Sequence, residues 1–168
     1  MSNSYTANAL DSNNIDLNFE DDPSKTIQIK RIRLLNELGQ PSYTFSNKYP
    51  IDLEMEIKVR ERRKDAYLGC VMYMSDDSIL GDSQTNDLEP KFEWRKPGSY
   101  LVKLRFPANV YNSGIYRLGA YAALSSDATD RRDFSFQIIN GQPFGQTVGG
   151  SRKGALLLRL EWEFAESK

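Results

Sequence analysis

Two segments in the middle of the chain, 67–74 and 115–124, place aromatic, cationic and very small side chains at alternating positions. Successive side chains of a β-strand point to opposite faces, so these residues would share one face of each strand. They are Tyr67, Gly69, Val71 and Tyr73 in the first segment and Arg117, Gly119, Tyr121 and Ala123 in the second. Aromatic rings stack on the C–H face of a sugar, and planar donors hydrogen-bond its hydroxyl groups. The pattern therefore predicts a surface that holds a carbohydrate.

The opposite side of both segments is apolar and includes Tyr116, which predicts that this side faces a core. We therefore expect Tyr73, Arg117 and Tyr121 to be the central carbohydrate contacts. Cross-strand aromatic packing would explain the two tyrosines equally well. Arg117 could likewise be an outward charge paired with a neighbouring acid. If the glycan end is acidic, Arg117 is its expected bidentate partner, and otherwise the end is a neutral sugar.

A polar segment, 79–86, follows the first strand and is expected to return alongside it. Gln84 and Asn86 lie on this segment and could reach the rim of the same face. A turn or capping role would also account for these polar side chains. We include both residues in the expected carbohydrate-binding set.

Alternating apolar and polar residues separated by turn residues fill the chain from Thr26 onward. This spacing predicts an all-β fold, an antiparallel β-sandwich of Ig-like or jelly-roll-like type. The faultless alternation in 51–59 predicts a strand with one buried and one solvated face. A change of phase predicts a β-bulge near Lys30 and Arg31. We expect residues 1–25 to form a polar linker or N-terminal arm and residues 26–168 to form the binding domain.

Composition argues against several classes of partner. The 168 residues contain 22 Lys and Arg against 23 Asp and Glu, so no overall charge favours nucleic acid or an acidic membrane. The sequence contains no apolar run long enough to span a bilayer, and residues 1–14 do not resemble an export signal. The single cysteine, Cys70, excludes an internal disulfide and is expected to be a small buried side chain. These features are compatible with a cytoplasmic protein.

We expect no enzymatic activity, no metal and no cofactor. The chain has no histidine, the usual acid-base group at neutral pH and a common zinc ligand. The glycine-rich stretch 141–154 contains no phosphate-loop motif. The acidic pairs Asp76/Asp77 and Asp82/Asp87 could serve a glycosidase, but they lie in predicted turns where acidic residues are ordinary.

The C-terminal segment 155–164 is the most apolar expected strand and follows the glycine-rich stretch. Its alternating apolar residues are Leu156, Leu158, Leu160, Trp162 and Phe164. A strand on a long hinge can fill its place in its own sandwich or in that of a second copy. Both arrangements remain open from these residues alone.

Several short motifs occur in a recognisable order. They are YLGCVMYMSDD at 67–77, the return 81–86, NSGIYRL at 112–118, FSFQI at 134–138 and Trp162. Over residues 26–164 this order resembles the C-terminal carbohydrate-binding domain of the ATPase subunit in ABC transporters that export bacterial O-antigen polysaccharide.

The resemblance implies a β-sandwich that recognises the finished, non-reducing end of a lipid-linked O-polysaccharide on the cytoplasmic side of the membrane. It also implies a homodimer that exchanges the C-terminal strand, and a partner ATPase domain that is absent from these 168 residues. Binding residues differ with the glycan, so the expected site rests on strand facing alone. The alternative function is a dimerisation or adaptor sandwich that binds another protein, since Tyr and Arg are also enriched at interfaces.

Overall fold

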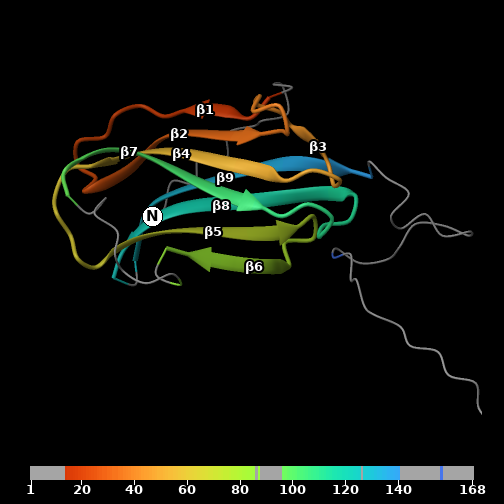
Figure 1. Cartoon of the computed structure of the whole chain (residues 1–168). Helices are drawn as coiled ribbons and strands as arrows, with labels where there is room; N and C mark the ends of the chain where they lie inside the picture. Colours follow the sequence, from red (N-terminus) through yellow and green to blue (C-terminus); the bar gives the residue numbers. More distant parts are fainter. Residues whose placement is uncertain (1–13, 86, 88–95, 126, 141–155, 157–168) are drawn as a thin grey trace, which may run out of the picture.

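A computed structural model describes residues 14–85, 87, 96–125, 127–140 and 156, and these residues form two packed β-sheets (Figure 1). The first sheet contains, in spatial order, β1 (Asp16–Asn18), β2 (Ile27–Leu35), β4 (Ile51–Val59) and β7 (Gly98–Phe106). The second contains β3 (Thr44–Ser46), β9 (Asp127–Ile139), β8 (Gly114–Leu124), β5 (Ala66–Met74) and β6 (Ile79–Gln84). The pairing is antiparallel except between β3 and β9. The predicted all-β sandwich is confirmed.

The core lies between the two sheets and is built from one side of each long strand. In β4 the side chains of Ile51, Leu53, Met55, Ile57 and Val59 are buried, as the alternation predicted. Pairing between β2 and β4 shifts register between Ile29 and Arg31, which confirms the expected bulge. No helix in the described part of the chain has the length and apolar character needed to cross a membrane.

Residues 14–25, which we expected in a linker or arm, pack on the sandwich. Ile15 is completely buried, and β1 pairs with β2 so that Asp16 lies opposite Arg33. The physical reason is that the edge of β2 offers unpaired backbone groups, and even a three-residue strand with an apolar neighbour can satisfy them. The brief alternation of Ile15, Leu17 and Phe19 in the sequence is the local signal for this attachment.

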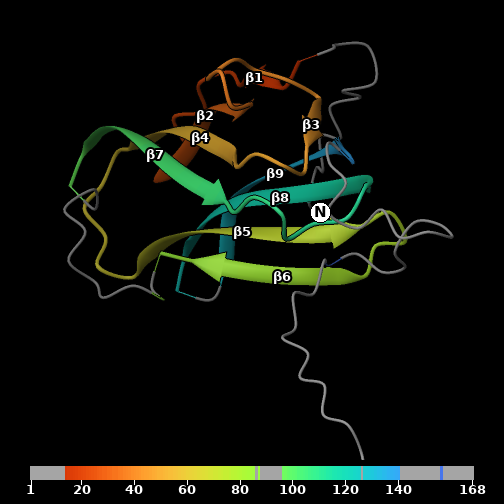
Figure 2. The ribbon, with the colours of Figure 1, turned by 45° about the vertical axis from the view of Figure 1, so that its right-hand side comes forward.

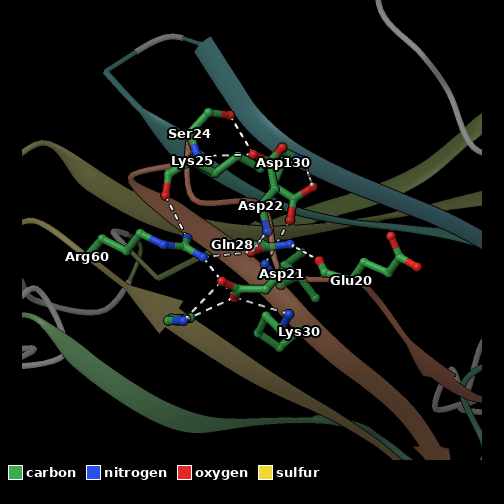
Figure 3. A network of polar contacts seen from close by, with 11 residues as sticks. Glu20, Asp21, Asp22, Ser24, Lys25, Gln28, Lys30, Arg60 and Asp130 are labelled. Carbon is green, nitrogen blue, oxygen red and sulfur yellow. Dashed lines mark hydrogen bonds and ion pairs between the residues drawn. The ribbon is translucent and has the colours of Figure 1, made fainter.

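A network of polar side chains holds the segment after β1 against the sandwich (Figure 3). Asp21 forms ion pairs with Lys30 of β2, Lys58 of β4 and Arg60, which follows β4. The buried Gln28 side chain donates to the carbonyl oxygen of Glu20 at 2.6 Å. The segment is therefore attached by side-chain contacts to both β2 and β4 of the first sheet.

Asp130 of β9 connects the two sheets at the β2 bulge. Its side chain is almost fully buried, and its Oδ2 accepts a 2.8 Å hydrogen bond from the backbone N–H of Ile29. The other oxygen pairs with Lys25 at 2.8 Å and with Arg132 at 3.0 Å. A bulge interrupts ladder pairing, so the carboxylate supplies an acceptor that the neighbouring strand does not.

Candidate functional site

β5 and β8 lie next to each other in the second sheet, and this pairing brings the predicted residues together (Figure 2). In the antiparallel register Tyr73 lies opposite Arg117, and Gly69 lies opposite Tyr121. Tyr116 points to the other side and is buried in the core between the sheets. The predicted facing of both strands is therefore confirmed.

We use the term outer face for the surface of this sheet that points away from the core. β6 and β9 flank the central pair and add polar side chains, because directly opposed residues share a face. Its main side chains are Tyr67, Tyr73, Asp82, Gln84, Arg117, Tyr121, Arg131 and Asp133. Asn86, the remaining member of the expected set, lies outside the described residues.

Tyr121 lies flat across the outer face and is covered by its neighbours. Only 8% of the residue is exposed, although it points away from the main core. Its ring passes directly over Gly69, where a Cβ atom would lie 2.2 Å from ring atoms. Tyr67 contacts the same ring edge-on, with 6.2 Å between the centroids. Glycine at position 69 is therefore required for this placement of the ring.

The hydroxyl group of Tyr121 is held by two residues of β6. Gln84 donates to it at 3.0 Å, and the hydroxyl donates to Asp82 at 3.2 Å. Burial, followed by the nearby negative charge of Asp82, raises the pKa of Tyr121 to about 12. The neutral phenol is thus the form that this face stabilises.

We expect the Tyr121 phenol to ionise well above the exposed tyrosines. A folded-state pKa of about 12 against an ordinary value of 10.0 favours the protonated form in the folded chain. Its contribution to stability is complete below the ordinary pKa and is lost as the pH rises towards about 12. An ultraviolet tyrosinate titration of the wild type minus that of Tyr121→Phe measures this group. A difference curve centred near the ordinary tyrosine pKa would contradict the burial of the phenol.

Tyr73 and Arg117 form the second part of the outer face. The Arg117 guanidinium carbon lies 4.0 Å from the centroid of the Tyr73 ring, a cation–π contact. Arg117 also donates to Asp77 at 2.7 Å and to Asp133 at 2.8 Å. Asp77 has a left-handed backbone, with φ of 65°, in the turn between β5 and β6. That turn conformation brings a carboxylate to Arg117.

Arg131 of β9 completes this cluster. Its guanidinium donates to the Tyr73 hydroxyl group at 2.9 Å and to Asp133 at 2.9 Å through both Nε and Nη2. A Cβ atom at Gly119 would lie 2.7 Å from Arg131 Nη2, so this glycine also makes room for a side chain. The hydrogen bonds to Asp133 and to Tyr73 raise the pKa of Arg131 above its ordinary value, and burial, which lowers it, is the smaller effect.

Four residues that shape the outer face were not in the expected carbohydrate-binding set: Asp77, Asp82, Arg131 and Asp133. Asp77 and Asp82 were considered only as members of acidic pairs. The signal for the other two was present, since Arg131 and Asp133 alternate with the buried Phe134 and Phe136 of β9. Both structural alternatives for the central residues are present in this structure, because the tyrosines pack across strands and Arg117 is paired with acids. These contacts hold the side chains of the outer face in fixed positions.

Asp76 does not have the environment of a catalytic acid, and Asp82 lies in strand β6 and not in the turn that we expected. Asp76 accepts hydrogen bonds from the backbone and hydroxyl groups of Ser78, and these bonds lower its pKa. A glycosidase general acid needs the opposite shift. Asp87 accepts a hydrogen bond from the backbone of Gln84 and so holds the end of β6. Within the described ranges, His, Cys, Asp and Glu form no group suited to a metal ion.

The expected exchanged strand, 155–164, lies outside the described residues apart from Leu156. Leu156 forms an isolated antiparallel bridge with Tyr111. Cys70, expected to be buried, is buried against the core, and burial raises its pKa to about 12. It is therefore a packing residue in this fold.

No family model matches this chain, and no curated protein matches it in sequence. Among solved structures, the C-terminal domain of Wzt is similar, with a TM-score of 0.68 and 13% sequence identity, covering 94% of each chain. The CARDB domain of a Pyrococcus furiosus protein, solved in complex with di-metal ions, gives a TM-score of 0.42 and 7% identity, covering 68% of this chain and 92% of that chain. That second overlap is too weak to support an argument. The chain therefore has the β-sandwich fold of the Wzt C-terminal domain.

Proposed function

We propose that this chain is a non-catalytic carbohydrate-binding module that recognises the non-reducing end of an O-antigen polysaccharide for export. The outer face of the β5–β8 pair is the proposed site. The motifs of the sequence support this function through their resemblance to the carbohydrate-binding domain of O-antigen transporters. The fold is compatible with it, since the chain shares the β-sandwich of the C-terminal domain of Wzt. In this proposal the module works at the cytoplasmic side of the membrane beside the ATPase domain.

The observation that carries the proposal is an outer face with fixed aromatic rings and polar groups. Tyr67 and Tyr73 remain partly exposed beside the more deeply buried Tyr121, and Asp82 and Gln84 reach the same surface from β6. Stacking on a ring contributes on the order of 1 kcal/mol beyond buried area. Because the rings are already held by neighbouring side chains, little side-chain entropy is lost on binding. We expect modest affinity, which suits a module that must release its cargo.

Saturation-transfer NMR with O-polysaccharide of the source organism tests the proposal. We expect transfer to sugar protons at the non-reducing end, because a terminal residue can present one complete C–H face to Tyr67 or Tyr73. Polysaccharide with that end removed enzymatically is the matched control and should give little transfer. Equal transfer from both samples, or none from either, would contradict recognition of the chain end.

Binding of another protein is the second candidate function. The burial of Tyr121 under its own neighbours favours it, since a covered, well-packed face also suits an interface. Sedimentation of Arg117→Glu beside the wild type separates the two candidates. A wild-type dimer that this substitution dissociates would assign the outer face to a protein contact. An unchanged oligomeric state, together with lost glycan transfer, would assign it to carbohydrate.

A further inference from the structure

The two arginines of the outer face already have carboxylate partners in this structure. Arg117 donates to Asp77 and Asp133, and Arg131 donates to both oxygens of Asp133. Asp82 is a third carboxylate near the same surface and accepts a hydrogen bond from the hydroxyl of Tyr121. Two guanidinium groups thus lie among three carboxylates. The cluster that they form has no excess of positive charge to offer an anion.

We propose that the outer face selects an uncharged sugar end, and that Asp77 and Asp133 exclude a glycan end carrying a carboxylate or a phosphate. This inference rests on the proposed function and specifies the class of ligand. An incoming anion would have to displace Asp77 or Asp133 from Arg117, because Nε and Nη2 already donate to Oδ1 of Asp77 and Nη1 donates to Asp133. A hydroxyl group has no such competition, because it can donate to a carboxylate while the arginine bonds persist.

Asp77 and Asp133 differ in their exposure and in the arginines that they contact. The Asp133 side chain is 21% exposed and contacts both arginines, whereas the Asp77 side chain is 78% exposed and contacts Arg117 alone. Asparagine tolerates the left-handed backbone of position 77, so Asp77→Asn removes the charge and keeps the turn. Asp133→Asn likewise keeps an oxygen that can accept from Arg117 or Arg131.

Arginine Nε–H NMR signals during titration with inorganic phosphate test the exclusion without any glycan. The Arg117 signal is assigned as the one that is missing from the spectrum of Arg117→Lys. In the wild type we expect this signal to show no saturable shift with phosphate. In the double variant Asp77→Asn, Asp133→Asn we expect saturable phosphate binding, with a dissociation constant about tenfold or more below the highest phosphate concentration at which the wild type shows no saturation. Asp52→Asn, which removes a carboxylate from the Arg105 pair on the other sheet, is the matched control and should gain nothing at Arg117. Saturable binding at wild-type Arg117, or no gain in the folded double variant, would overturn the inference.

A second arm uses paired trisaccharides that end in galactose or in galacturonic acid and differ only at C6. Wild-type binding confined to the neutral member supports the inference, and a shift of preference towards the acidic member in the double variant supports it further. Stronger wild-type binding of the acidic member would overturn the inference while leaving glycan recognition intact. If the wild type binds neither trisaccharide, the result counts against the proposed function. The phosphate titration would still test whether Asp77 and Asp133 exclude an anion from the arginines.

Discussion

Replacing Asp130 by alanine is expected to lower the free energy of unfolding by about 3 kcal/mol, because it removes one partner of a buried ionic cluster. The carboxylate accepts from the backbone of Ile29 and pairs with Lys25 and Arg132. Alanine would leave a buried N–H and two partly buried cations without this acceptor. Urea unfolding followed by circular dichroism measures the change. We expect the melting temperature to fall by about 10 °C for a chain of this size.

Asp52→Ala is the matched control for this experiment. Asp52 forms a bidentate pair with Arg105, but that arginine side chain is 68% exposed. Exposed pairs contribute roughly 0–1 kcal/mol, so the control should change stability little. Asp130→Asn should fall between the two, since the amide oxygen can still accept from Ile29. Equal stability of Asp130→Ala and Asp52→Ala would contradict a role for the buried cluster in joining the sheets.

Replacing Gly69 by alanine is expected to remove glycan binding, with a loss of about tenfold or more in affinity. The added Cβ would lie 2.2 Å from the ring of Tyr121, so the ring must leave its position. That movement breaks the contacts with Tyr67, Gln84 and Asp82 that hold the outer face in place. The same O-polysaccharide used for the wild type, titrated in calorimetry, measures the loss. Ring-proton NMR shifts of Tyr121 report the displacement independently.

Gly81→Ala provides the matched substitution on the neighbouring strand β6, because a Cβ atom there has no neighbouring atom within 4 Å. It should bind glycan as the wild type does. Tyr121→Ala and Arg117→Ala should also lose binding while the sandwich remains folded, since both residues lie outside the main core. A folded Gly69→Ala variant with shifted Tyr121 signals and unchanged affinity would exclude this ring from the site.

The likeness to Wzt and the resemblance found in the sequence motifs depend on different observations. The motifs lie in a few short segments, whereas the structural overlap covers 94% of each chain at 13% identity. A sandwich needs only alternating apolar positions and compatible turns, so its fold can persist when most side chains differ. Side chains of the outer face do not pack in the main core, so the fold does not require them to be apolar. These residues can therefore change with the ligand while the sheets stay the same.

The facing of β5 and β8 could be predicted because strand alternation is a local property. A shift of one residue in the facing of β8 would place Tyr116 on the surface. The apolar residues that alternate with Tyr116 on the same side of the strand exclude that arrangement, and Tyr116 is buried. Residues 14–25 could not be placed in the same way. Their attachment depends on β2 offering an open edge and on Asp21 meeting Lys58 and Arg60, which are distant in sequence.

The amino-acid sequence by itself determined the all-β class, the strand phases, the bulge near Lys30 and Arg31, and which side of β5 and β8 faces the core. These properties follow from the two-residue period of a strand and from the need to bury apolar side chains. Only the tertiary structure decided the charge of the outer face. The partners of Arg117 come from a turn after β5 and from β9, and sheet pairing brings them together. Alternation indicates which face a residue occupies, whereas strand order and register determine which residues it meets there.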